Sequence, residues 1–343
     1  MIPELHDRVD RFGDELKSVG FEFSEIEFKS FLDSEKDFNS LFLVDNRLVV
    51  VKVYNSAMEE SDVVFQLEAM QIAAKSIKAP KLLFPLHAGQ IPHIFNHVYM
   101  TTVTEFIPGQ VLNRSIAVVP SELIRITERV GCVIRKMTKK FGMTKLRGRK
   151  KRLIWNFANF DSVVIELGAC LESDLRKDFA ALVPATSTAL NEAFRDTSQF
   201  QLCHYDCNDD NIIVTDNDEI GIIDFGDVDL GPRVVDVSLA CCYILINVFS
   251  TSEEVDPFYV KSVVESAMNG FTLTVPITDK ERALIPVLIV ARCIMSICIQ
   301  SSQRCANPDN SEYLSVSFKG SRALLRFVNS VSLDKFISLF SSL

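Results

Sequence analysis

Three polar side chains between positions 206 and 224 have the types and the spacing needed to hold a metal ion and to move a proton. Asp206 precedes Asn211 by five positions, and Asp224 follows Asn211 by thirteen. Runs rich in β-branched residues at 212–215 and 220–223 flank a turn-type sequence at 216–219 and predict a β-hairpin. A symmetric hairpin places Asn211 opposite Asp224, at the roughly 4.5–5.5 Å Cβ separation of directly opposed residues. These two side chains could then hold Mg²⁺, with Asp206 beside an acceptor hydroxyl, which is the arrangement that phosphoryl transfer needs.

The spacing gives this interpretation its specificity. Asp206 and Asn211 are spaced as in the catalytic loop of protein kinases, and the Asp-Phe-Gly triplet that begins at Asp224 matches the metal-binding triplet of those enzymes. The alternative is an acidic surface hairpin, which the flanking apolar strands disfavour. His204 is interpreted as structural, packing the loop and making a backbone hydrogen bond. Asp236, at the start of the next helix, is interpreted as a helix cap or a brace for the loop.

The rest of the chain predicts two lobes that would position this hairpin. The first part contains strand-like runs and one long helix, and a Pro-Gly break follows at 108–109. The predicted strands are residues 21–32, 41–44, 48–54, 82–87 and 97–106, and the predicted helix is 57–78. Beyond the break the pattern is mostly helical. We therefore expect an α+β, bilobal protein-kinase-like fold, with a β-rich N-terminal nucleotide-binding lobe (1–108) and a larger, mainly helical C-terminal catalytic and acceptor-binding lobe (109–343).

Lys52 and Glu68 provide an independent indication of nucleotide binding in the first lobe. Lys52 falls on a strand face shared with apolar residues, and Glu68 has an apolar residue four positions away on each side of the helix. A buried ammonium and a buried carboxylate each need a partner. The pattern predicts that the two pair and that Lys52 contacts the α- and β-phosphates. The alternative is a lysine reaching solvent from an edge strand and a glutamate at the margin of the stripe.

Two further segments are candidates for nucleotide contacts. The loop at 33–39 contains no glycine, so it must cover the phosphates differently from a glycine-rich loop. Ser34, Lys36 and backbone amides are the predicted contacts there, and an ordinary polar hairpin loop is the alternative. The backbone of Glu105, Phe106 and Ile107, at the expected hinge, is predicted to bind the purine edge.

Composition limits the classes of partner. The chain has 343 residues, of which 48% are hydrophobic and 24% charged, as in ordinary soluble globular proteins. Its net charge of −9 argues against nucleic acid as a partner. The basic segment at 139–152 is interpreted as a solvated loop, with a localisation or docking signal as the alternative.

Hydropathy and cysteine content predict a cytoplasmic protein that has no membrane partner. The apolar stretches at 234–249 and 283–299 are short for a membrane span, are interrupted by charged residues and read as buried helices. The N-terminus carries no apolar signal region. The nine cysteines show no repeated pair spacing, so we expect reduced thiols.

The segment after the Asp-Phe-Gly triplet indicates the size of the acceptor. A protein kinase has a long activation segment here that docks a peptide, whereas in this chain eight residues lead into the apolar stretch at 234–249. We therefore expect a small-molecule substrate enclosed by helices.

These motifs together resemble the aminoglycoside-phosphotransferase-like family of small-molecule kinases. The resemblance is carried by residues 34–39, 204–211, 223–227 and 310–314 and by Asp236 after a Gly-Pro pair, which together span most of the chain. Within that family, these segments imply transfer of the γ-phosphoryl group of GTP, or of ATP, with Mg²⁺, to the side-chain hydroxyl of 5-hydroxy-L-lysine. Two positions depart from the family pattern, because Tyr205 stands where glycine is usual and Cys207 where leucine is common.

An amino-acid acceptor would also need partners for its charged ends. Asp227 and Asp229 are the nearest candidates for an ammonium, and Arg292 is the candidate for a carboxylate. The alternative for Arg292 is an internal ion pair with Asp236 or another acid. Two other functions remain open: a related kinase for choline, ethanolamine or another amino alcohol or sugar, and a nucleotide-binding pseudokinase, which only the glycine-free loop suggests.

Overall fold

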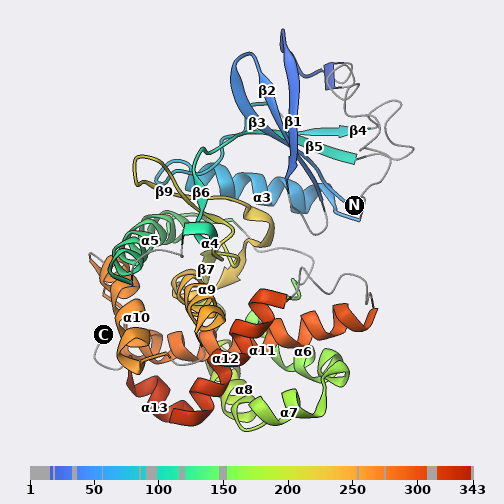
Figure 1. The fold of residues 1–343 in the computed structure, drawn as a ribbon. Coiled ribbons are helices and arrows are strands. Elements are labelled where there is room, and N and C mark those ends of the chain that lie inside the picture. Colours follow the sequence, from blue (N-terminus) through green and yellow to red (C-terminus); the bar gives the residue numbers. More distant parts are fainter. Residues whose placement is uncertain are drawn as a thin grey trace. The chain divides into compact units, whose positions relative to one another are not determined.

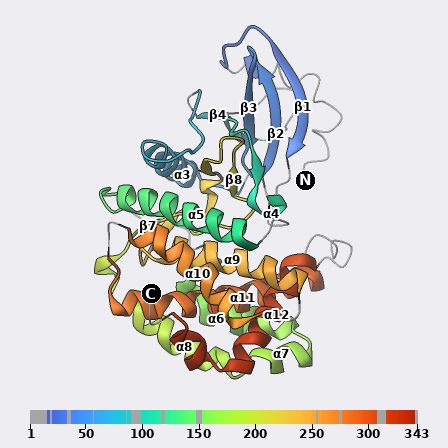
Figure 2. The same ribbon diagram turned by 60° about the vertical axis from the view of Figure 1, so that its left-hand side comes forward.

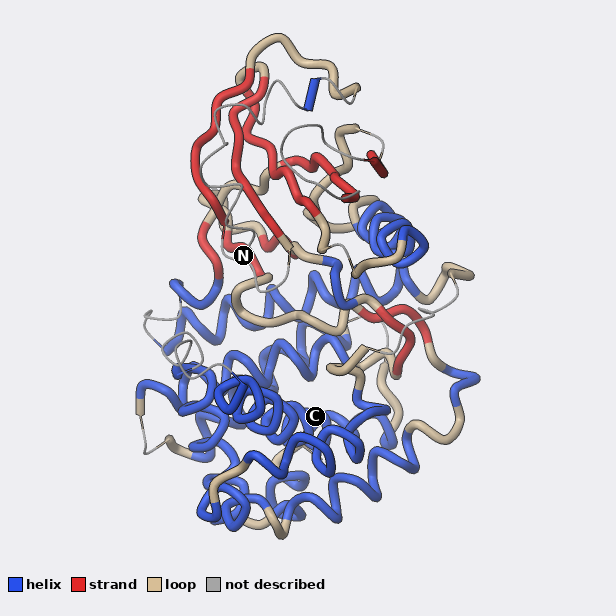
Figure 3. The backbone as a smooth tube through the Cα atoms, turned by 90° about the vertical axis from the view of Figure 1, so that its right-hand side faces the viewer, coloured by secondary structure: helices blue, strands red, loops and turns tan. Residues whose placement is uncertain are grey.

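The chain divides into two compact units, which we describe separately. They are Met1–Pro108 and Gly109–Leu343. The computed structural model describes residues 16–17, 20–32, 37–55, 57–84, 86–89, 99–115, 120–146, 153–252, 255–273, 276–306 and 315–340. Strands dominate the first unit and helices the second (Figure 3). The predicted α+β fold class is therefore confirmed.

In its described residues, the N-terminal unit contains an antiparallel sheet with helix α3 beside it (Figure 1). Its elements are β1 (Ile26–Leu32), β2 (Phe38–Val44), β3 (Arg47–Val53), α3 (Glu60–Ala73), β4 (His87–Gly89) and β5 (Tyr99–Glu105). The strand order is β1-β2-β3-β5-β4, so β3 is central, and Lys52 on β3 lies between Asn39 of β2 and Thr102 of β5.

Alternating residues of β2 and β3 build the core of this unit. The core cluster consists of Leu16, Phe21, Phe38, Phe42, Val44, Val49, Val51, Val53 and Val103. Because successive side chains of a strand point to opposite faces, Lys52 projects from the face that Val51 and Val53 do not share. The sheet thus places its one lysine of β3 outside the apolar cluster.

The first strand is shorter than the predicted run at 21–32. The N–H of Phe21 donates to the carbonyl oxygen of Leu16 (3.1 Å), and the N–H groups of Ser24 and Glu25 donate to the carboxylate of Asp45 (3.0 and 2.9 Å). These backbone groups are satisfied by a turn and a side chain, so ladder pairing begins only at Ile26.

The C-terminal unit is a set of packed helices with two small sheets. Its strands are β6 (Gln110–Val111), β7 (Gln201–Cys203), β8 (Ile212–Val214), β9 (Ile220–Ile222) and β10 (Asp229–Gly231). Its α-helices are α4 (Leu112–Ser115), α5 (Pro120–Phe141), α6 (Phe160–Leu167), α7 (Ser173–Phe179), α8 (Leu182–Ala193), α9 (Val235–Thr251), α10 (Pro257–Thr272), α11 (Asp279–Ala306), α12 (Ser315–Val331) and α13 (Leu333–Ser338). Short 3₁₀ turns are η1 (Phe157–Asn159), η2 (Gly168–Cys170), η3 (Thr197–Gln199) and η4 (Phe225–Asp227).

Helix α11 is the central helix of this unit and packs against α9, α12, α6 and α8 (Figure 2). Among the described helices, it alone is long and apolar enough to cross a membrane by length and composition, and 83% of its apolar window is buried inside the chain. It therefore has the burial of a core helix. The two small sheets carry the candidate site. Sheet β6-β8-β9 contains the predicted hairpin, formed by β8 and β9. Strand β7 precedes this hairpin in the sequence, and its pairing partner β10 follows it.

Candidate active site

The loop at 204–211 connects β7 to β8 and is anchored by a buried histidine. Nδ1 of His204 accepts the N–H of Asp206 (3.3 Å), so its proton resides on Nε2, which lies 3.1 Å from the carbonyl oxygen of Ile223 and donates to it. Burial lowers the pKa of His204 to about 4, so the ring is neutral at neutral pH. His204 therefore joins the loop to the end of the hairpin and has the structural role predicted for it.

The carboxylate of Asp206 is held on both oxygens by carboxamides of its own loop. Nδ2 of Asn208 donates to Oδ1 (2.9 Å), and Nδ2 of Asn211 donates to Oδ2 (2.6 Å). Burial raises the pKa of Asp206 well above its usual value, and the nearby carboxylates of Asp227 and Asp224 raise it further. A carboxylate that is fixed in position and has a raised pKa is suited to accept a proton from a hydroxyl.

The predicted register of the hairpin is wrong by one residue. In the ladder between β8 and β9, the N–H of Ile223 donates to the carbonyl oxygen of Asn211 (2.9 Å), so Asn211 lies opposite Ile223 and not opposite Asp224. A slip of one residue reverses the face of every side chain within a ladder. Asp224, however, lies beyond the last ladder pair, where the backbone changes direction.

The turn of the hairpin explains this register. Beyond the ladder pair Val214–Ile220, the N–H of Thr215 donates to the carbonyl oxygen of Glu219 (2.9 Å) and the N–H of Glu219 donates to the Thr215 hydroxyl (3.0 Å), so the turn is closed to the three residues 216–218. Asp218 supplies the left-handed residue of the turn, with φ 63°. The sequence 216–219 predicted a four-residue turn and gave no sign of this extra closing pair.

Asp224 adopts a left-handed conformation, with φ 56° and ψ 81°. Its Oδ1 accepts the N–H of Gly226 (3.0 Å) and caps the 3₁₀ turn η4. The carboxylate lies close enough to Asp206 and to His204 to raise the pKa of both groups. Asp224 thus stays electrostatically coupled to the loop at 204–211, although the ladder register differs from the prediction.

The donor set suits a magnesium ion better than a transition metal. Among the described residues no cluster of three His, Cys, Asp or Glu side chains could hold a metal ion. Mg²⁺ is usually bound by one or two carboxylates together with substrate phosphates and water. Oδ1 of Asn211 accepts no hydrogen bond within the described part of the chain, and Asp224 is exposed, so both fit such a site.

Asp236 braces the catalytic loop from the first turn of α9. Its Oδ2 accepts the N–H of His204 (2.9 Å), and its Oδ1 accepts the N–H of Tyr205 (3.0 Å). Burial raises the pKa of Asp236 to about 6, while these two hydrogen bonds oppose the shift. The predicted brace is confirmed. The predicted helix cap is not, because Val234 is the N-cap residue of α9 and has no side-chain cap bond.

Tyr205 occupies a backbone conformation that favours glycine. Its φ is 64°, in the left-handed region that glycine adopts most easily, and glycine is the residue that the family resemblance implied here. The buried side chain donates from its hydroxyl to the carbonyl oxygen of Leu230 (3.2 Å) and lies 3.4 Å from Oδ1 of Asn156. A Cβ atom on Gly231 would lie 2.3 Å from the Tyr205 hydroxyl oxygen, so the tyrosine depends on that glycine.

The two predicted ammonium partners follow the hairpin directly. Asp227 ends η4, and Asp229 begins β10. Oδ2 of Asp229 accepts a hydrogen bond from Nδ2 of Asn156 (2.8 Å), while its Oδ1 accepts the N–H of Leu230 (2.8 Å). Asp229 is thus oriented by a segment far away in the sequence, and Asp227 lies near enough to Asp206 to raise its pKa.

Arg292, on α11, is 1% exposed and lies against aromatic rings. Its guanidinium carbon is 5.1 Å from the ring centre of Trp155 and 5.0 Å from that of Phe157. Nη2 donates to the carbonyl oxygens of Trp155 (3.3 Å) and Tyr205 (3.2 Å), and Nε is buried and has no hydrogen-bond partner. No carboxylate among the described residues lies within ion-pair distance of Arg292. The predicted alternative, an internal ion pair with Asp236 or another acid, is therefore wrong for these residues.

In the N-terminal unit, Lys52 pairs with Asp37 and not with Glu68. Nζ of Lys52 is 3.1 Å from Oδ2 of Asp37. Glu68 is exposed and forms no ion pair among the described residues, and Val64, on the same predicted stripe, is 38% exposed. The predicted apolar stripe was wrong because α3 buries the side that carries Val63, Gln66, Leu67, Met70 and Ala73.

The backbone at 105–107 is partly committed to hydrogen bonds within its own unit. The N–H of Glu105 donates to a carbonyl oxygen in the segment after α3 (2.8 Å), and the N–H of Phe106 donates to a carbonyl oxygen of β3 (3.2 Å). The N–H of Ile107 has no hydrogen-bond partner within the described residues. Of these three amides, Ile107 therefore has the one best suited to a purine edge. Ser34 and Lys36 lie outside the described residues.

Sequence reasoning did not assign the asparagines that organise the site. Oδ1 of Asn208 accepts the N–H groups of Asp210 and Asn211, at 2.9 Å each. On α9, Nδ2 of Asn247 donates to the buried carboxylate of Asp209, whose pKa burial raises to about 7. The tendency of asparagine to bond the backbone two residues on could have identified Asn208. Nothing in the sequence signalled Asn247.

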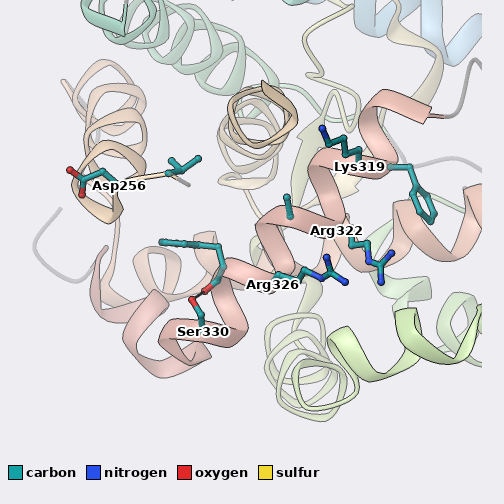
Figure 4. Close-up of a pocket in the computed structure, with 9 residues that line it drawn as sticks. Asp256, Lys319, Arg322, Arg326 and Ser330 are labelled. Carbon is teal, nitrogen blue, oxygen red and sulfur yellow. Dashed lines mark hydrogen bonds between the residues drawn. The ribbon is translucent and has the colours of Figure 1, made fainter. Parts of the chain in front are cut away.

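One cavity of the C-terminal unit lies away from these residues. It measures about 930 Å³ and lies between the start of α10 and α12. Figure 4 shows Lys319, Arg322 and Arg326 along α12, with Asp256 across from them. Arg322 and Arg326 both contact Asp178 (2.7 and 3.2 Å), so part of their charge is balanced within the unit. None of the predicted site residues lines this cavity.

The oriented carboxylate of Asp206, with the amide of Asn211 and the carboxylate of Asp224 nearby, is the combination of groups that the sequence predicted for phosphoryl transfer. Residues 30–263 match the model of the phosphotransferase enzyme family, and the chain belongs to that family. It is similar to the hydroxylysine kinases of Mus musculus (25% identical over 233 residues) and Bos taurus (26% over 235 residues). Each match covers 64% of this chain and 58% of the relative.

Solved structures confirm the protein-kinase-like fold predicted from the sequence. The chain is similar to an amicoumacin kinase in complex with AMP-PNP and Ca²⁺ (TM-score 0.69, 13% identity, 95% of this chain and 96% of that one). It is also similar to a microcompartment-associated aminopropanol kinase (0.65, 14%, 96% and 99%) and to a choline/ethanolamine kinase family protein from Mesorhizobium loti (0.64, 11%, 96% and 99%). At these identities the likeness shows the fold alone.

Proposed function

We propose that this chain transfers the γ-phosphoryl group of GTP or ATP to the side-chain hydroxyl of 5-hydroxy-L-lysine. The observation that carries the proposal is the carboxylate of Asp206, which Asn208 and Asn211 fix on both oxygens and whose pKa is raised. The similarity to two hydroxylysine kinases supports the choice of acceptor.

Asp206 acts as the general base in this mechanism. The acceptor oxygen bonds to the γ-phosphorus and gives its proton to the Asp206 carboxylate, while the bond from that phosphorus to the bridging oxygen breaks and releases the nucleoside diphosphate. Asn208 and Asn211 keep the carboxylate in position throughout. A positioned general base contributes roughly 10²–10⁴ to the rate.

Named groups are assigned to the nucleotide and its metal ion. In the C-terminal unit, Asp224 and Oδ1 of Asn211 would hold Mg²⁺, which when bound neutralises charge on the phosphates. In the N-terminal unit, Lys52 contacts the phosphates, and the backbone at Ile107 contacts the purine edge. GTP serves at least as well as ATP, as the resemblance of the motifs implies.

Charged side chains near the loop account for an amino-acid acceptor. Asp229, oriented by Asn156, or the neighbouring Asp227 meets an ammonium group. Arg292 meets the carboxylate. Three features of the Arg292 guanidinium support this assignment. It is buried, its Nε has no hydrogen-bond partner, and no carboxylate among the described residues pairs with it. A buried cation is costly without a counter-charge, and a bound carboxylate would supply one.

The test is to identify the product. The purified chain is incubated with MgGTP or MgATP and with 5-hydroxy-L-lysine or lysine, and the products are analysed by mass spectrometry with fragmentation. We expect a phosphoester on the hydroxyl of hydroxylysine, and no product from lysine because it lacks the nucleophilic oxygen. Phosphorylation at a nitrogen, or no transfer from either nucleotide, would contradict the proposal. Nucleotide binding without transfer to any acceptor would indicate a pseudokinase.

A further inference from the structure

The lysine of β3 has an unexpected counter-ion. We propose that Asp37, which directly precedes β2, is the positioning residue that holds Lys52 for the nucleotide phosphates, and that no carboxylate of α3 has this task. The proposal rests on the kinase function proposed above. It also assigns a role to a residue of the glycine-free loop, whose acidic side chains would otherwise only oppose phosphate charge.

The register of the sheet brings the two side chains together. Lys52 lies directly opposite Asn39, and Asp37 is two positions before Asn39, so Asp37 and Lys52 are diagonal neighbours on one face. Diagonal neighbours in an antiparallel pair are roughly 7–8 Å apart, within reach of a long side chain. The contact is therefore a product of strand pairing and needs no movement of α3.

The carboxylate of Asp37 is fixed at both oxygens. Oδ2 is 3.1 Å from Nζ of Lys52, and Oδ1 accepts the N–H of Asn55 (3.0 Å) just after β3. Each side chain of the ion pair is 18% exposed, so water screens the pair only partly. The centre of the Tyr54 ring lies 5.4 Å from Nζ of Lys52 and restricts the movement of the ammonium group on another side. Asp37 thereby restricts where Lys52 points.

Among the carboxylates of α3, Asp62 in the first turn is buried (4% exposed), and the ion pair of Lys52 is formed with Asp37 instead. Glu68 lies on the exposed side of the helix. Gln66, two residues earlier, lies on the buried side, where it is neutral and 5% exposed. Val63 and Met70, on the buried side, are 0% and 6% exposed, and burial of their apolar surface stabilises this orientation of the helix.

An ammonium held by one carboxylate can still bind phosphate. Lys52 has three N–H donors, and the contact with Asp37 uses one of them. Removing the charge of Asp37 has two opposed effects, because it loosens Lys52 and also removes a negative charge beside the phosphates. We therefore expect turnover to change more than nucleotide affinity.

The test compares Asp37→Asn with Glu68→Gln, a matched removal of one carboxylate from the same unit. The asparagine can still accept the N–H of Asn55, so the local turn is kept. We expect Asp37→Asn to lower kcat on the order of tenfold with a smaller change in nucleotide KM, since a charge-assisted hydrogen bond is lost. Glu68→Gln should leave both constants unchanged. Asp37→Glu should restore part of the rate, and thermal melting of each variant reports on folding.

A double-mutant cycle shows whether Asp37 acts through Lys52. On a Lys52→Met background, Asp37→Asn should cause no further loss. An equal loss on that background, or a loss in Glu68→Gln and none in Asp37→Asn, would overturn the proposal. The same constants measured for the slow hydrolysis of MgATP, with water as acceptor, test Asp37 even if hydroxylysine is not the substrate, so the two proposals fail separately.

Discussion

Nδ2 of Asn211 donates to the carboxylate Oδ2 of Asp206 over 2.6 Å and to its carbonyl oxygen over 3.0 Å. One carboxamide therefore fixes the proposed base with its nitrogen and offers its oxygen to the proposed metal ion. The base and the metal site are mechanically linked through a single side chain. A change at Asn211 is therefore expected to affect both proton transfer and metal binding.

Asp206→Asn should lower kcat roughly 10²–10⁴-fold, because an amide cannot take the proton of the acceptor hydroxyl. Nucleotide affinity should change little, since Asp206 is assigned no phosphate contact. Steady-state kinetics and calorimetry with a non-hydrolysable nucleotide measure the two effects. Asp216→Asn, at the exposed turn of the same hairpin, is the matched control. If Asp206→Asn turns over at the wild-type rate, the base has been misassigned.

Asp224→Ala should weaken binding of the Mg²⁺–nucleotide complex, because it removes a carboxylate from the ion that neutralises the phosphates. The loss should be seen with Mg²⁺ present and should shrink when the nucleotide is titrated without it. Asp216→Ala provides a control for the removal of one charge. Unchanged metal-dependent affinity, measured by titration calorimetry, would remove Asp224 from the metal site.

Gly231→Ala should destabilise the chain by roughly 1–3 kcal/mol, the usual cost of overpacking a tight interior. The new Cβ would lie 2.3 Å from the hydroxyl oxygen of Tyr205. On a Tyr205→Phe background the cost should be smaller, because the hydroxyl is absent. Gly168→Ala is the control, since its Cβ would meet its nearest atom at 3.7 Å. Equal costs on both backgrounds in urea unfolding would show that Tyr205 and Gly231 are not coupled.

The lowered pKa of His204 predicts a specific dependence of the free energy of unfolding on pH. Its pKa falls from 6.5 to about 4 on burial, so between these values the unfolded chain binds a proton that the native chain excludes. The stability that His204 contributes is full above pH 6.5 and is lost as the pH falls through 4. Asp236 and Asp209, whose pKa values are raised to about 6 and about 7, give a pH dependence of the opposite sign, because the stability that each contributes is lost as the pH rises.

The comparison with His204→Gln isolates the histidine. The free energy of unfolding of the wild type minus that of the variant should decrease as the pH falls from 6.5 to 4, by on the order of 3 kcal/mol. Chemical unfolding at several pH values measures the difference. A difference that is flat across this range would mean that His204 is not held neutral in the native chain.

Spacing alone was enough to predict that Asp206 and Asn211 lie together, because five positions between them leave little freedom for a short turn. The structural roles of His204 and Asp236 also followed from position. The hairpin register did not, since it depends on the left-handed φ of Asp218, which any of several polar residues in the turn could have adopted.

The errors in the N-terminal unit have a similar cause. An α-helix with apolar residues on several sides does not reveal which side is buried, so Glu68 was placed on the wrong face of α3. To predict the pairing of Lys52 with Asp37, the register of β2 against β3 had to be known. That register depends on the exact length of the turn between the two strands, which could not be read from the sequence. In both cases long-range packing decided between local patterns of similar strength.

The most direct test of the proposed function is a competition among acceptors. One reaction contains the wild-type chain, MgGTP and equal concentrations of 5-hydroxy-L-lysine, choline, ethanolamine and homoserine, and the initial ratios of phosphorylated products are measured by mass spectrometry. These ratios equal the ratios of kcat/KM. The account predicts that phosphohydroxylysine predominates, because only an amino acid with a hydroxyl and a second ammonium uses Asp206, Arg292 and Asp229 together. Predominance of phosphocholine or phosphoethanolamine would contradict it.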